Sequence, residues 1–426
     1  MRTPEVATST NHALVGTDPV CAFYTAHPYP PPVTNLDRAR EEWQDADRRR
    51  AEHHLLWPDK PYYADLDILV AGCGTWQAAK YAICRPRARV VGIDVSATSL
   101  EHTDQLRRKY GLSNLQIEQR SIEQVEAMEQ QFDLIVCTGV LHHLVHPTAG
   151  LRELRSALKP DGALYLMVYA PYGRTGIYMI QEYCRRIGIG TTGREIEDLS
   201  AALEALPRSH PLRIALAASR DARNSDALAD ALLNPRDQSF AVPQLFELLD
   251  RGGLTFGRWY WQAPYLPQCG AFAATPHADR VATLTPVQRY AAMELWRGTM
   301  TSHSLVAYRN DAPSEAVKVH FDDERWQRYV PMRLPHTVCI EERLPAGAAA
   351  VLLNRSHQHH DLIVAITAQE KRMFDAIDGH RTIAEIAAEA GAAPLRSAMT
   401  LFERLWQYDQ VVFDTSAEST SCRYLL

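Results

Sequence analysis

The 426-residue sequence contains no long hydrophobic run, no C-x-x-C pair and no excess of positive charge. No window approaches the ~18 consecutive apolar residues of a transmembrane helix, so we expect no membrane association. The N-terminus lacks the basic start and apolar core of a signal peptide, and the eight cysteines are scattered. These features predict a reduced, cytoplasmic protein. A formal net charge of −6 argues against a nucleic-acid partner.

The composition that is present is that of a globular protein, with 46% hydrophobic and 23% charged residues. A chain of this length predicts two or three domains. We expect an N-terminal lid and helix over 1–65 and an α/β domain over 66–310 with a helical insert at 173–240. A polar linker at 311–335 then precedes a small domain over 335–426.

The N-terminal part shows two patterns. Residues 21–33 interleave aromatic side chains with four prolines, which predicts a stiff extended segment rather than a helix. From Asn35 to Leu56, apolar residues recur at spacings of three and four, which predicts one amphipathic helix.

Apolar segments alternate with helical ones between residues 67 and 170, which is typical of a parallel sheet covered on both faces. Later segments at 256–266 and 302–310 predict two further strands that complete the sheet as an antiparallel pair. The expected fold class is therefore a doubly wound, mostly parallel, seven-stranded α/β sheet. Its first five strands are predicted at 67–74, 88–96, 114–118, 132–140 and 162–170.

The C-terminal part predicts a small α+β domain that is similar to winged-helix domains. Two capping boxes, Thr367–Glu370 and Thr382–Glu385, open helices, and a third helix is expected at 395–409. Residues 340–426 contain 8 basic and 12 acidic side chains, so we do not expect DNA binding. The order of elements also resembles small domains that recognise leader peptides, but dimerisation or substrate capping is the preferred interpretation.

The motif that indicates chemistry is the turn Gly72–Thr75 between the first expected strand and the following helix. Glycines there let the backbone approach a ligand, and the helix N-terminus offers free N–H groups. Asp94 ends the next strand, where a carboxylate can accept hydrogen bonds from ribose hydroxyls. Dinucleotide-binding enzymes need a further glycine where this sequence has Gln77, which argues against NAD.

Four segments in order resemble the class I S-adenosylmethionine-dependent methyltransferases: ILVAGCGT, GIDVSATSLE, FDLIVCTGVLHHL and LKPDGALYLMVY. The resemblance implies S-adenosylmethionine as cofactor, with Gly72 and Gly74 under its methionine part and Asp94 on its ribose. The cofactor-binding residues that it implies are Gly72, Cys73, Gly74, Asp94, Val95, Ser121, Ile122, Gly139, Val140 and Leu141.

Three positions depart from the family pattern. Val70 and Ser121 stand where the family often has an acid, and Trp76 stands where it usually has a third glycine. The Trp76 indole either lines the cofactor pocket or turns into the core between helix and sheet. Gly72, Gly74 and Asp94 are intact, so the expected cofactor is the same in both cases.

Candidates for the transfer step follow the ends of the fourth and fifth strands. His142 or His143 could act as a base or shape the site, or both could simply pack. Tyr169, Tyr172 and Arg174 could bind an acceptor or have an ordinary loop role. An N-terminal lid over the cofactor would be formed by Tyr24, His27 and Tyr29.

No metal site is expected, because His142, His143 and His146 lack a nearby carboxylate or cysteine that would complete a ligand set. His357, His359 and His360 are typical of a solvated turn. The leading functional hypothesis is methylation of a small organic molecule or secondary metabolite, in a chain that could form a homodimer. The alternatives are a peptide or protein methyltransferase, and a non-catalytic cofactor-binding scaffold in which Trp76 blocks the methyl position.

Overall fold

A computed structural model describes residues 18–213, 224–312, 319–392 and 395–416 of the chain. Residues 1–17 of the expected N-terminal lid and residues 214–223 of the expected insert lie outside these described residues. No described helix combines the length and the apolar character needed to cross a membrane. The seven cysteines in the described part of the chain are free.

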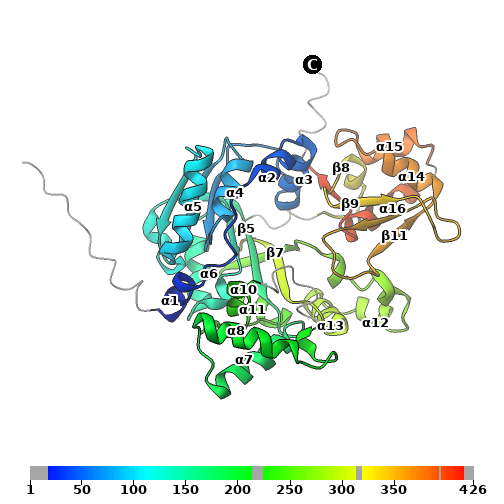
Figure 1. Cartoon of the computed structure of the whole chain (residues 1–426). Coiled ribbons are helices and arrows are strands. Elements are labelled where there is room, and N and C mark those ends of the chain that lie inside the picture. The colour runs from blue at the N-terminus through cyan, green and yellow to red at the C-terminus, as the bar shows by residue number, and fades with distance from the viewer. Residues whose placement is uncertain (1–17, 214–223, 313–318, 393–394, 417–426) are drawn as a thin grey trace, which may run out of the picture.

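A seven-stranded sheet forms the centre of the larger domain, in the order β3-β2-β1-β4-β5-β7-β6. Figure 1 labels β5 and β7, which are neighbours in this order. The first five strands are parallel, and β7 pairs antiparallel with both β5 and β6. The predicted fold class, including the antiparallel final pair, is confirmed. The strands are β1 (Asp67–Ala71), β2 (Arg89–Asp94), β3 (Leu115–Gln119), β4 (Phe132–Thr138), β5 (Leu158–Tyr169), β6 (Leu254–Trp259) and β7 (Ser302–Arg309).

Both faces of this sheet are buried, because alternate side chains of each strand point to opposite sides. Ile68 and Val70 of β1 belong to one hydrophobic cluster, whereas Leu69 and Ala71 belong to another. The surrounding helices of the α/β alternation are α4 (Gln77–Cys84), α5 (Ala97–Tyr110), α6 (Pro147–Ser156), α11 (Val242–Arg251), α12 (Ala278–Ala282) and α13 (Pro286–Arg297).

The expectation of an extended segment over residues 21–33 is wrong for its first part, where helix α1 (Pro19–Ala26) forms. Asp18 caps this helix by accepting a hydrogen bond from the N–H of Val20. Pro19 occupies the first turn, where a backbone N–H would have no partner within the helix, so the N–H that proline lacks is not missed. The prolines of the segment begin only at Pro28, after the helix has ended.

The single helix expected between Asn35 and Leu56 is two helices, α2 (Asp37–Glu42) and α3 (Ala46–Leu56). Asp45 causes the break, because its carboxylate accepts hydrogen bonds from two N–H groups at the start of α3. The new direction of α3 packs Ala51 and Leu55 against the C-terminal part of the chain.

The insert is helical in its described residues, with α7 (Thr175–Ile187), α8 (Gly193–Glu204) and α10 (Ser225–Leu233). These helices pack together around Ile180 and Leu199, and Phe23 of α1 joins the same cluster. Figure 1 shows α7 and α8 in green beside the blue α1.

The C-terminal part contains two small sheets, with orders β11-β10-β9 and β12-β8, around three helices. Strand β8 lies within the linker expected at 311–335. That expectation is wrong for these residues, because β8 pairs antiparallel with β12 and so belongs to the C-terminal domain. In a winged-helix domain the β-hairpin follows the third helix. Here the antiparallel pair β10–β11 precedes all three helices, so the winged-helix resemblance is not confirmed. The elements are β8 (Val330–Arg333), β9 (Thr337–Ile340), β10 (Ala350–Asn354), β11 (Ile363–Ile366), α14 (Ala368–Asp375), α15 (Ile383–Glu389), α16 (Leu395–Gln407) and β12 (Val411–Asp414). Both predicted capping boxes are present.

A buried carboxylate joins the two parts of the protein. Asp409 is fully buried and accepts hydrogen bonds from the N–H groups of Gln262 (3.1 Å) and Ala263 (3.0 Å). His357 lies 3.0 Å from the same carboxylate with its side chain 2% exposed, which corrects its expected place in a solvated turn. Arg258 completes the group at 3.4 Å.

We expect Asp409→Ala to destabilise the protein by about 3–5 kcal/mol, because removal of one member of a buried ionic group leaves the others unpaired. Urea unfolding of the full chain measures this loss. Asp375→Ala, which removes an exposed carboxylate paired with Lys371, serves as the control and should change the free energy of unfolding by under about 1 kcal/mol. Equal effects of the two substitutions would contradict a structural role for Asp409.

Candidate active site

The turn after β1 brings the backbone to the carboxyl edge of the sheet. The N–H groups of Gly72 and Cys73 both donate to the carbonyl of Ile93, which fixes the turn against β2. Gly72 has φ +71°, and a Cβ there would lie 2.3 Å from a methyl carbon of Val140. Only glycine therefore fits this position, and the turn leaves its backbone open to a ligand.

Asp94 lies at the end of β2, beside this turn. One carboxylate oxygen accepts the N–H of Gly74 and the other accepts the N–H of Ser96, each at 2.9 Å. Burial raises the pKa of Asp94, and these backbone donors oppose that shift. Each oxygen keeps a further lone pair, so the carboxylate can also accept hydrogen bonds from ligand hydroxyls.

A cavity of about 700 Å³ lies over these residues. Of the ten cofactor-binding residues expected from the sequence, nine line it. Leu141 does not, because its side chain is fully buried in the core. The nine residues are Gly72, Cys73, Gly74, Asp94, Val95, Ser121, Ile122, Gly139 and Val140.

The glycine cradle, the carboxylate and the volume of the cavity fit S-adenosylmethionine. Gly72 and Gly74 would lie under the methionine part, and Asp94 would bind the ribose hydroxyls. When bound, the cofactor supplies a methyl group that its sulfonium centre already activates.

The N-terminal segment forms one wall of this cavity, as the lid hypothesis anticipates for Tyr24 and Tyr29. The hydroxyl of Thr75 donates to the carbonyl of Pro30 at 2.7 Å, and the hydroxyl of Ser96 donates to the carbonyl of Tyr24. His27 does not face the cavity. Its ring binds Asp226 and the carbonyl of Thr191, both in the insert.

Trp76 combines the two interpretations that the sequence leaves open. Its side chain lines the cavity and also packs against the hydrophobic cluster under α4, for which it is the N-cap residue. The indole therefore narrows the cavity beside the glycine turn without filling it.

A hydrogen-bonded group of side chains lies where β4 ends. The Tyr24 hydroxyl lies 3.1 Å from Nε2 of His143 and donates to Asp230 at 2.7 Å, and Asn234 donates to it at 3.0 Å. Nδ1 of His143 donates to the carbonyl of Arg236 at 2.5 Å. His143 and Tyr24 line the cavity, whereas Asp230 lies behind them on α10.

His142 and Arg174 lie behind the cavity wall and not in the cavity. The His142 ring stacks on Tyr169 with centroids 3.7 Å apart, and the Arg174 guanidinium lies 3.5 Å from the same ring. Two groups this close to one ring must lie on its opposite faces, so His142 and Arg174 hold the Tyr169 ring between them. Tyr169 itself lines the cavity. Arg174 is further fixed by a buried ion pair with Asp237 at 2.9 Å. Burial lowers the pKa of His142 well below its usual value.

Sequence reasoning missed Asp230 and Asn234. Both lie at the end of the insert, in a stretch whose pattern indicates only a helix, and an aspartate on a helix is usually solvated. Tyr172, the remaining candidate, is 41% exposed. Among the described residues, no three metal-ligating side chains come together.

Sequence comparisons find methyltransferases among the proteins that this chain is similar to. A family model for a methyltransferase domain matches residues 64–185. The chain is 30% identical over 310 residues to the uncharacterised protein syc1184_c of Synechococcus, covering 70% of this chain and 73% of that protein. It is also 32% identical over 148 residues to the ubiquinone biosynthesis O-methyltransferase of Actinobacillus pleuropneumoniae, covering 31% of this chain and 62% of that enzyme.

A solved structure shares the fold over nearly the whole chain. PKMT2 from Rickettsia typhi in complex with AdoHcy superposes with a TM-score of 0.61 at 17% identity, covering 91% of this chain and 78% of that one. AdoHcy is the product that S-adenosylmethionine leaves after methyl transfer. The structure shares this fold, and the family model over residues 64–185 and the O-methyltransferase relative identify the chain as an S-adenosylmethionine-dependent methyltransferase.

Proposed function

We propose that this enzyme methylates a hydroxyl or similar proton-bearing group of a small organic molecule. The cavity supports a small acceptor, because the N-terminal segment and the end of β5 wall it on two sides. The likeness to an O-methyltransferase of ubiquinone biosynthesis, which covers 148 residues and 31% of this chain, agrees with an acceptor of this class.

The observation that carries the proposal is the proton count around the Tyr24 hydroxyl. Nδ1 of His143 donates to a carbonyl, so Nε2 is an acceptor when the ring carries a single proton. The ionised carboxylate of Asp230 is an acceptor as well. Tyr24 has a single proton for both contacts, so one of them lacks a proton.

One additional proton, shared among His143, Tyr24 and Asp230, would give both contacts of the Tyr24 hydroxyl a proton. Transfer of a methyl group to a hydroxyl releases one proton, which must leave the acceptor oxygen as the new carbon–oxygen bond forms. His143 and Tyr24 face the cavity and receive this proton, and Asp230 stabilises the protonated group. Burial raises the pKa of Asp230, which favours proton uptake.

The test uses cofactor whose methyl group is deuterated, incubated with the full chain and either a metabolite extract or a peptide pool. Mass spectrometry is expected to find the label in small molecules. Asp94→Ala is the control and should lose this labelling. Label found only in peptides would replace the proposal with the alternative peptide or protein acceptor.

A further inference from the structure

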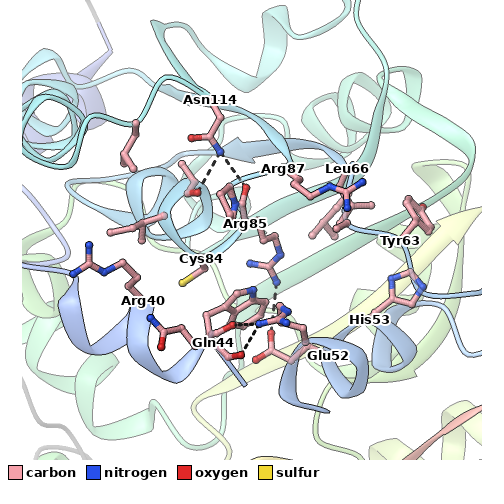
Figure 2. A pocket seen from close by; sticks show the side chains of 18 of the residues that line it. Arg40, Gln44, Glu52, His53, Tyr63, Leu66, Cys84, Arg85, Arg87 and Asn114 are labelled. Carbon is pink, nitrogen blue, oxygen red and sulfur yellow. Dashed lines mark hydrogen bonds and ion pairs between the residues drawn. The ribbon is translucent and has the colours of Figure 1, made fainter. Parts of the chain in front are cut away.

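A second cavity, of about 740 Å³, lies at the opposite edge of the sheet, where the parallel strands begin. One wall is formed by α2 and α3, and the other by the end of α4 and the residues after α5. Figure 2 shows Gln44 and Glu52 on the first wall and Arg87 and Asn114 on the second. The proposed acceptor site is at the other end of the strands, so an occupant here is not the methyl acceptor.

Aromatic rings gather at one end of this second cavity. His53 lies edge-on against Tyr62 and Tyr63, with ring centroids 5.4 Å and 5.1 Å away. Trp57 lies 5.1 Å from the same histidine, and Tyr62 is 38% exposed at the mouth. A planar aromatic ligand can stack against such rings.

Two buried polar side chains at this end have no hydrogen-bond partner at normal geometry among the described residues. They are Trp57, which is 1% exposed and keeps a free indole N–H, and His53, which is 5% exposed with its two ring nitrogens beside the backbone of Lys60 and Pro61. Burial lowers the pKa of His53 to about 3, although the nearby backbone of Lys60 and Pro61 opposes this shift. The neutral ring and the indole therefore offer donors to a ligand that carries an acceptor group.

The charge of the cavity wall is positive. Arg40, Arg49, Arg85 and Arg87 line it, against the single carboxylate of Glu52. Glu52 lies 3.6 Å from Arg85, and exposed aspartates outside the cavity pair with Arg40 and Arg87. In the described part of the chain no carboxylate pairs with Arg49, which donates only to the carbonyls of Trp43 and Gln44.

The positions on α3 explain how these groups come to one place. Arg49, Glu52, His53 and Leu56 are spaced three and four residues apart, so they share one face of the helix. The opposite face, with Ala51 and Leu55, packs on the C-terminal sheet.

We propose that this cavity is a binding site for a planar aromatic anion, such as an aromatic carboxylate. The rings of Tyr62 and Tyr63 stack on the ligand, Trp57 and His53 donate hydrogen bonds to it, and Arg49 supplies the unpaired positive charge. The site is separate from the cofactor cavity. Helix α4 connects the two, because its N-cap residue Trp76 lines the cofactor cavity and its C-cap residue Arg85 lines this one.

The test measures binding of 2-naphthoate to the full chain saturated with AdoHcy, by ligand-observed NMR titration. The carboxylate should bind although the cofactor cavity is filled, and uncharged 2-naphthamide should bind about tenfold more weakly, the effect of one charge-assisted hydrogen bond. Displacement of 2-naphthoate by AdoHcy, or the absence of saturable binding, would overturn the proposal.

Two variants locate the site. Arg49→Gln should weaken 2-naphthoate binding about tenfold and leave 2-naphthamide unchanged, whereas Arg152→Gln, outside the cavity, should change neither. Ser113→Trp places a bulky ring at the exposed end of the cavity and should abolish binding of both compounds with AdoHcy affinity intact. Unchanged 2-naphthoate affinity in a folded Ser113→Trp variant places the compound elsewhere and contradicts the proposal.

Discussion

Asp94→Ala is expected to weaken the binding of AdoHcy about tenfold or more, as measured by isothermal titration calorimetry. A hydrogen bond to a charged acceptor contributes roughly 1.5–3 kcal/mol, and a loss of about 1.4 kcal/mol is a tenfold change in affinity. The carboxylate also orders the turn, because it accepts the N–H groups of Gly74 and Ser96. Both effects weaken binding.

Two further variants separate the contributions to this effect. Asp94→Asn keeps the shape of the side chain but loses its charge, so it should bind AdoHcy with intermediate affinity. Asp198→Ala removes an exposed carboxylate on α8 and should leave binding unchanged. Wild-type affinity in a folded Asp94→Ala variant would contradict the ribose contact.

Asp230→Asn is expected to lower kcat about a hundredfold or more, the range for loss of general acid–base catalysis. AdoHcy affinity should be unchanged, because Asp230 acts through Tyr24 and does not line the cavity. Asp226→Asn is the matched control, one helical turn away on α10 and paired with His27 outside the group. It should keep near-normal kcat.

The pH dependence of kcat gives a second measure of Asp230. The group must be deprotonated to take up the proton of the acceptor, so activity falls as the pH is lowered. An ordinary aspartate has a pKa of about 3.9. Burial raises the pKa of Asp230, so the loss of activity should begin at a higher pH than an ordinary aspartate would give. In Asp230→Asn the acidic limb should move. An identical pH profile in the variant would show that Asp230 does not stabilise the protonated group.

The centre of the sheet could be predicted from the sequence because β1, β2 and β4 are buried on both faces and read as continuous apolar runs. The glycine turn and Asp94 were also accessible, since a local motif specifies both. Breaks in local pattern were harder to detect. Asp45, for example, divides α2 from α3 by capping a helix inside a pattern that reads as continuous.

The features that sequence reasoning missed depend on contacts between distant segments. Strand β8 forms only through its pairing with β12, far along the chain. Asp230 meets Tyr24 over 206 residues of sequence, and Asp409 accepts hydrogen bonds from a loop about 147 residues away. No local pattern marks a carboxylate that is buried by the folding of the rest of the chain.

A crystal structure of the full chain with AdoHcy tests the central claim most directly. The ribose hydroxyls should lie within hydrogen-bonding distance of Asp94, with the methionine part over Gly72 and Gly74. The sulfur should point toward the side of the cavity that holds His143 and Tyr24. AdoHcy bound at any other place, with the cavity beside Asp94 empty, would contradict the account.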